Sequence, residues 1–134
     1  GEPSKPLSAV ASGGELSRLL LALKVVLAEA SPVTTLIFDE VDSGVGGATA
    51  AAVGERLARL AEQRQVLVVT HSPQVAALGR YHWQVRKETA GEETVTRVVP
   101  LDTAARQEEV ARMLSGTQIT QEARAAAGKL MAKP

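Results

Sequence analysis

The sequence TLIFDE, residues 35–40, is a short apolar run that ends in two acidic residues. A continuous apolar run of this length is typical of a strand buried on both faces of a parallel sheet. A second such run, QVLVV at residues 65–69, ends in Thr70 and His71. Between the two runs, about residues 48–63, apolar side chains recur at helical spacing. Strand, helix and strand in this order predict a right-handed crossover with parallel strands, and therefore an α/β fold.

The flanking segments predict further helices and one hairpin. Residues 13–30 carry leucines at helical spacing, among them Leu23 and Leu27, and predict a well-buried helix. The remaining expected elements are a short helix from Pro73 to Leu78, two exposed strands at about 81–88 and 93–99 joined by Ala90-Gly91-Glu92, and two helices at 104–114 and 120–132. The opening residues 1–6 resemble the middle of a loop, so we expect the chain to be an excised piece.

Composition excludes several classes of function. The 134 residues suffice for one domain, but they fall below the comfortable size of a complete nucleotide hydrolase. Basic and acidic residues number 15 each, whereas a self-sufficient DNA-binding module usually has a basic excess. The absence of cysteine excludes disulfides and thiolate metal sites. No apolar run approaches the roughly 18 residues of a membrane span, so no membrane partner is expected.

Asp39 and Glu40 stand at the carboxyl end of the first predicted strand. Ligands of open α/β sheets bind outside those ends. A carboxylate there can hold Mg²⁺, usually through water, while its neighbour polarises an attacking water. Two acidic residues can also simply mark the point where a strand meets solvent.

His71 ends the second predicted strand, at the same edge of the sheet as Asp39 and Glu40 if the strands are parallel. Its imidazole could donate to a terminal phosphate or orient a hydrolytic water. A lone histidine is more often an ordinary structural residue, and that is the interpretation of His82, which falls within a predicted strand.

Ser12-Gly13-Gly14-Glu15 opens the predicted helix at residues 13–30 and has the form of a capping box. Backbone amides at a helix N-terminus favour an anion, and two glycines let the backbone approach a phosphate closely. Taken alone, the segment can equally be an N-cap that merely starts a helix.

Together, the three groups resemble the second half of an ABC-type ATPase. The resemblance identifies residues 12–15 as the signature motif, residues 36–40 as the Walker B strand and His71 as the switch histidine. The D-loop would comprise Asp42, Ser43, Gly44 and Gly46. Gly46 occupies the position where the superfamily usually has the D-loop aspartate, so the contacts of that aspartate are in doubt.

Longer stretches point to one branch of the superfamily. Residues 10–18 resemble SMC-like heads more than transporter cassettes, which favour glutamine after the two glycines. The loops at 38–47 and 69–76 specifically resemble a bacterial SMC-like protein of double-strand-break repair, as do residues 86–89 and 106–116. The alternatives are another SMC-like chromosome or repair ATPase, a transporter cassette fragment, and an interaction domain that has lost turnover.

No P-loop pattern occurs in the chain. The resemblance then implies that residues 1–134 are the C-terminal lobe of an ATPase head, with residues 1–11 as a linker. It implies ATP and Mg²⁺ as cofactors, an N-terminal P-loop lobe of the same protein and a second, identical head as partners, and DNA bound through the full-length protein. Glu40 would act as base and Asp39 as the magnesium residue, while Ser12, Gly13, Gly14 and Glu15 would meet the γ-phosphate of the opposite head. The lobe alone would be inactive, and the whole protein would be cytoplasmic and nucleoid-associated.

Overall fold

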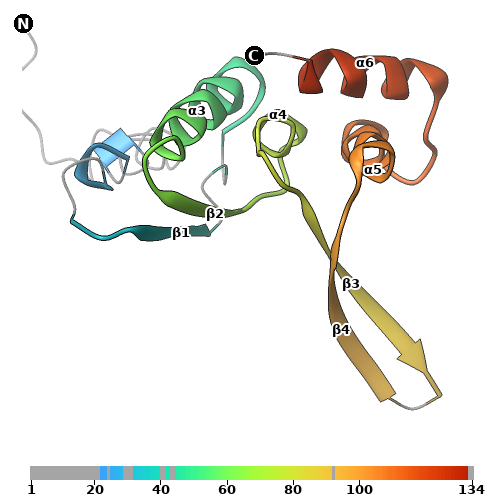
Figure 1. Ribbon diagram of the computed structural model, residues 1–134. Coiled ribbons are helices and arrows are strands. Elements are labelled where there is room, and N and C mark those ends of the chain that lie inside the picture. Colours follow the sequence, from blue (N-terminus) through green and yellow to red (C-terminus); the bar gives the residue numbers. More distant parts are fainter. Residues whose placement is uncertain are drawn as a thin grey trace, which may run out of the picture. The chain divides into compact units, whose positions relative to one another are not determined.

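The computed structural model describes residues 22–23, 25–28, 32–39, 42, 45–91 and 93–132. These residues form two compact units, divided between Val75 and Ala76 (Figure 1). Each unit has its own hydrophobic core. A short helix, α4 (Pro73–Ala76), lies at the division. None of the helices in the described ranges has the length and apolarity that crossing a membrane requires.

The first unit is built on two parallel strands, β1 (Thr35–Asp39) and β2 (Gln65–Val69), joined through helix α3 (Gly47–Leu60). Thr35 lies opposite Gln65 and Asp39 opposite Val69, so the two strands end level with each other. The predicted strand, helix and parallel strand are therefore confirmed.

Helix α3 ends earlier than the predicted residue 63. After Leu60 the amides of Glu62 and Gln63 donate to the carbonyls of Arg59 and Leu60, three residues back rather than four. This tighter pairing satisfies carbonyls that a helix end would otherwise leave open, and it turns the chain toward β2.

The expectation that β1 is buried on both faces was wrong. Leu36 and Phe38 point toward the core of the unit, whereas the side chain of Ile37, on the opposite face, is 72% exposed. Val69 at the end of β2 is 52% exposed. A continuous apolar run does not reveal which face is covered. In the described part of the unit, the core forms on one face of the strand pair only.

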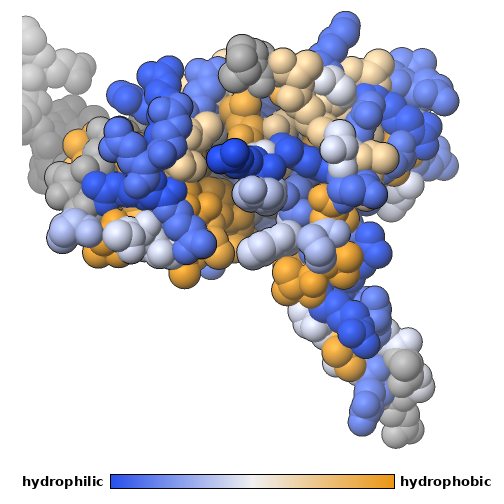
Figure 2. All heavy atoms as spheres, in the orientation of Figure 1, coloured by the Kyte–Doolittle hydropathy of each residue, from blue (hydrophilic) through white to orange (hydrophobic). Residues whose placement is uncertain are grey.

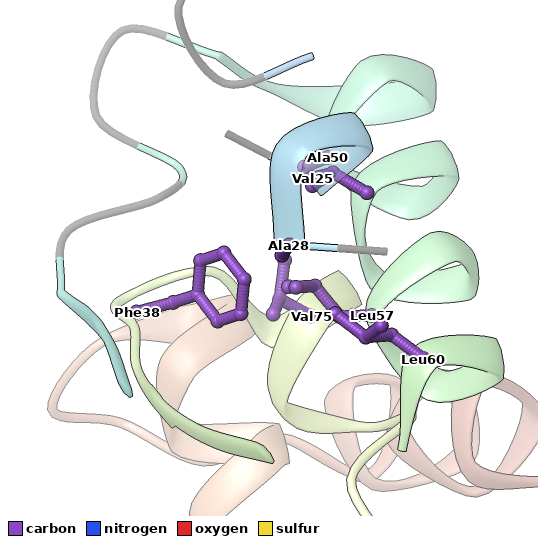
Figure 3. Close-up of a cluster of buried hydrophobic side chains, with 7 residues drawn as sticks. All are labelled: Val25, Ala28, Phe38, Ala50, Leu57, Leu60 and Val75. Atoms are coloured by element: carbon purple, nitrogen blue, oxygen red, sulfur yellow. The ribbon is translucent and has the colours of Figure 1, made fainter. Parts of the chain in front are cut away.

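The core of the first unit brings together side chains from four segments (Figure 3). Its buried members are Val25, Ala28, Phe38, Ala50, Leu57, Leu60 and Val75. Leu57 and Leu60 lie one helical turn apart on α3, the spacing that places two side chains on one face. Each large apolar side chain buried in this way contributes about 1.5–3 kcal/mol of stabilisation.

The predicted helix at 13–30 is described only at residues 22–23 and 25–28, which are helical. Its buried face differs from the predicted one. Val25 and Ala28 enter the core, whereas Leu23 and Leu27 are 50% and 60% exposed. The sequence is apolar around most of this helix, so the leucine spacing alone could not identify the side that packs on α3 and the strands.

The second unit begins with an antiparallel hairpin of β3 (Trp83–Ala90) and β4 (Glu93–Pro100). Gly91, in the turn, has a φ of +68°, a conformation that favours glycine and explains the predicted break at this place. Apolar and polar side chains alternate along the surface of the hairpin (Figure 2). Strand β3 starts two residues later than predicted, so Tyr81 and His82 precede the strand rather than lie in it.

Two capped helices complete the second unit, α5 (Thr103–Ser115) and α6 (Gln121–Met131). The Asp102 carboxylate accepts from the amide of Ala105, and the Thr120 hydroxyl accepts from the amide of Ala123. Gly116 ends α5 with a φ of +79°. The core between the helices consists almost wholly of small side chains, namely Ala77, Val110, Ala111, Ala123 and Ala127.

Candidate functional site

The carboxyl edge of the β1–β2 pair carries two of the predicted site residues. Asp39 is the last residue of β1, exposed and level with Val69. His71 is also exposed, and it follows Val69 by two residues. The parallel register therefore places an acidic residue and a histidine at one edge of the sheet, as the two apolar runs predicted.

Asp42 joins the two loops at this edge. It lies beyond β1, yet one of its carboxylate oxygens, Oδ2, accepts hydrogen bonds from the segment that follows β2. The donors are the Thr70 hydroxyl at 2.5 Å, the His71 amide at 3.2 Å and the Ser72 amide at 2.7 Å. The Val45 amide donates to the Asp42 carbonyl at 3.1 Å, which closes a turn around this residue.

Thr70 and Ser72 are site residues that the sequence did not single out. The Ser72 amide also reaches Thr70 Oγ1 at 2.9 Å, and the Ser72 hydroxyl donates to Gln74 Oε1 at 2.8 Å. Ser72 is the only buried polar residue among those described, at 9% exposure. Serine and threonine next to a proline commonly bond to nearby backbone, and this pattern in Thr70-His71-Ser72-Pro73 was the available signal.

Two glycines at the start of α3, Gly46 and Gly47, differ in whether their backbone conformation requires glycine. Gly46 is the N-cap of the helix with a φ of −141°, which any residue adopts, and a Cβ added there would meet nothing within 4 Å. Gly47 has a φ of +53°, where a side chain would be strained. The backbone conformation therefore explains glycine at 47 but not at 46, where a Cβ would be tolerated by the described residues.

Several predicted site residues lie outside the described part of the chain. They are Ser12, Gly13, Gly14, Glu15, Glu40, Ser43 and Gly44. Within the described part, no group of three or more potential metal-ligating side chains gathers in one place. Among the residues that the structure describes at the strand end, Asp39 offers an exposed carboxylate, and a single carboxylate fits Mg²⁺, which usually keeps several of its waters.

His82 lies in the second unit, among side chains of α5. Burial lowers the pKa of His82 below its ordinary value, the charge of Arg106 lowers it further, and Glu109 opposes this shift. The Nδ1 atom is buried without a hydrogen-bond partner. Arg106 donates to the carbonyls of Ala76 at 3.3 Å and Ala77 at 2.7 Å. These contacts agree with the interpretation of His82 as a structural residue.

Solved structures similar to this one identify its fold. No family model matches the chain. A chain from a study of ATP-driven dimerization and DNA-stimulated activation of SMC ATPases matches with a TM-score of 0.68 at 20% identity, over 88% of this chain and 70% of that one. The SMC head domain from Thermotoga maritima matches with a TM-score of 0.57 at 27% identity, over 76% and 37%. The fold is that of an SMC ATPase head, with a parallel sheet, a small hairpin and helices after it.

At the level of sequence, the chain is similar to bacterial proteins named DNA repair protein RecN. The chain is 53% identical to RecN of Xylella fastidiosa and 48% identical to that of Vibrio cholerae, over 98% of its length in both cases. It is 54% identical to RecN of Deinococcus radiodurans over 87% of its length. The resemblance inferred from the motifs is thus confirmed. The chain spans 24% of the length of the first two relatives and 20% of the third.

Proposed function

We propose that this chain is the C-terminal lobe of the ATPase head of a RecN-like protein that acts in double-strand-break repair and recombination. The observation that carries the proposal is the level ending of β1 and β2, which brings Asp39 and His71 to one edge of the sheet. The similarity to proteins named DNA repair protein RecN supports the same conclusion.

The roles of the residues follow from the chemistry of phosphoryl transfer, in which positioning and charge stabilisation dominate. Asp39 would hold Mg²⁺ through water, and bound magnesium would neutralise charge that develops on the phosphates. Glu40 follows directly and would orient and deprotonate the attacking water, while His71 would donate to the γ-phosphate. Ser12, Gly13, Gly14 and Glu15 would present a helix N-terminus to the nucleotide of a second head. Asp42, Ser43, Gly44 and Gly46 would form the D-loop, the loop between the two heads.

The open face of the β1–β2 pair supports a partner lobe. Ile37 and Val69 present apolar side chains to solvent on the face opposite the core, at 72% and 52% exposure. We propose that the P-loop lobe of the same protein covers this face and supplies the remaining phosphate contacts. ATP would then lie between two identical heads, and DNA and a cytoplasmic location would belong to the full-length protein.

Another SMC-like ATPase is the nearest alternative. The identity to the solved SMC heads, 20–27%, is much lower than the identity to the RecN relatives, 46–54%. This difference favours RecN. The same relatives favour a repair protein over a transporter cassette fragment.

The deciding experiment measures ATP turnover by the full-length protein with Glu40→Gln. Loss of a general base should lower kcat about 10²-fold or more, while ATP binding and ATP-dependent association of the heads persist. Glu62→Gln, which changes an exposed carboxyl at the end of α3, is the matched control and should keep wild-type turnover. Wild-type turnover by Glu40→Gln would refute the assigned role. Magnesium-dependent turnover by the isolated 134-residue chain would refute the split site.

A further inference from the structure

Three donors from one short segment converge on a single carboxylate oxygen of Asp42. Two of them are consecutive backbone amides, those of His71 and Ser72, at 3.2 and 2.7 Å, and the third is the hydroxyl of Thr70. Asp42 belongs to the loop after β1 and the donors to the loop after β2. The contact therefore ties together the two loops that would carry the chemistry.

This contact restrains the backbone of His71 and leaves its side chain exposed. Two consecutive amides that aim at one oxygen fix the backbone between them, and with it the direction in which the His71 side chain leaves the chain. The Ser72 amide is also held by Thr70 Oγ1. Hydrogen bonds to a charged acceptor are about twice as strong as neutral ones. Without the carboxylate, the exposed His71 amide would lose this acceptor, and the partly buried Ser72 amide would keep only Thr70 Oγ1.

We infer that Asp42 is a positioning residue that holds His71 in the orientation required for ATP turnover. The inference rests on the proposed ATPase function. It gives Asp42 a role within its own head, in addition to its place in the loop between heads. Asp42 touches no reacting atom in this role and acts only through the segment that carries His71.

The test is a double-mutant cycle in the full-length protein, with Asp42→Ala, His71→Ala and the two together. Asp42→Ala should lower kcat about tenfold to hundredfold, the loss expected when a catalytic group is misplaced by about 1 Å. The KM for ATP should change less than about twofold, because ground-state binding is not involved. In the His71→Ala background, Asp42→Ala should cause no further loss, because the residue through which it acts is gone.

Milder variants and a control keep the inference testable if Asp42→Ala does not fold. Asp42→Asn keeps an oxygen acceptor without the charge and should fall between wild type and Asp42→Ala. Thr70→Val removes one donor and should lower kcat a fewfold, whereas Thr70→Ser keeps the hydroxyl and should restore it. Asp102→Ala removes another carboxylate that accepts a backbone amide, at the start of α5, and should leave kcat unchanged.

The outcomes separate this inference from the proposed function. If His71→Ala lowers kcat but Asp42→Ala lowers it equally in both backgrounds, the positioning role is wrong while the ATPase proposal stands. An unchanged kcat for both Asp42→Asn and Thr70→Val would also overturn the positioning role. If His71→Ala itself has no effect, both the positioning role and the assigned role of His71 fail. The result for Glu40→Gln still decides the ATPase proposal independently.

Discussion

Among the described residues, the two units differ in how their helix ends are capped and in where they expose apolar side chains. The second unit closes its helix ends with its own side chains, and ion pairs join Arg112 to Glu109 and Arg124 to Glu108. In the first unit, helix α3 has no side-chain cap at its N-terminus. Both units expose apolar side chains on their strands, for example Ile37 in the first and Val85 in the second. Because each unit has its own core, we expect the second unit to keep its structure when the first is weakened, while the proposed partner lobe would cover the exposed strand face of the first.

The prediction with the largest expected effect tests whether the two cores unfold independently. Phe38→Ala removes a side chain that is 7% exposed at the centre of the first core, and it should cost about 3–5 kcal/mol of unfolding free energy. Hydrogen exchange followed by mass spectrometry should show that β1, α3 and β2 lose protection while α5 and α6 keep theirs. Ile37→Ala, on the exposed face of the same strand, should cost below about 1 kcal/mol. Equal loss of protection in α5 and α6 would show that the second unit is not self-contained.

The second core should be destabilised when a larger side chain is introduced. Ala127 is fully buried between α5 and α6, at 0% exposure, and Ala127→Leu should destabilise the chain by about 1–3 kcal/mol through overpacking. Urea denaturation followed by circular dichroism measures the effect. Ala125→Leu, on the exposed side of α6, is the control and should stay within about 0.5 kcal/mol of the wild type. A neutral Ala127→Leu would mean that the small residues are not closely packed.

The open face of the first unit should matter only in the complete protein. Ile37→Glu should change the stability of the isolated chain by less than about 0.5 kcal/mol. In the full-length protein the same change places a charge against the proposed partner lobe, and ATP turnover should fall about tenfold or more. Val85→Glu, at 66% exposure in the hairpin, is the matched control and should be neutral in both settings. Equal behaviour of Ile37→Glu in both settings would contradict a partner on this face.

The smallest expected effect is a pH dependence confined to the second unit. The pKa of His82 is lowered in the folded chain by burial and by Arg106, with Glu109 in opposition, so the unfolded chain takes up a proton first as the pH falls. The free energy of unfolding is therefore unaffected by His82 above about pH 6.5, the ordinary histidine value. It decreases as the pH falls through that value toward the folded pKa. His82→Gln should flatten the dependence of the urea midpoint on pH in this window. An unchanged slope in His82→Gln would refute this origin.

Much of the fold could be predicted from sequence because its signals are local. Two apolar runs predicted β1 and β2, and Ala90-Gly91-Glu92 predicted the hairpin break. The covered face of β1 could not be predicted, because an apolar run without alternation contains no information on which side packs. The same limit led to the wrong buried side for the helix that contains Leu23 and Leu27.

The candidate site was predictable in position but not in its contacts. Asp39 and His71 were expected at one edge because parallel strands end together, and the register of β1 and β2 agrees. The partners of Asp42 lie 28–30 residues away along the chain, and no local pattern specifies which carboxylate meets which amide. The roles of Ser12 to Glu15 and of Glu40, all outside the described residues, stay predictions.

The hairpin also carries the residue that dominates the intrinsic fluorescence of this chain. Trp83 is the only tryptophan of the chain, and at 59% exposure it lies at the start of β3, outside both cores. Its emission should therefore respond to a molecule that covers the start of β3. Intrinsic tryptophan fluorescence is therefore a probe of contacts made at the start of the hairpin.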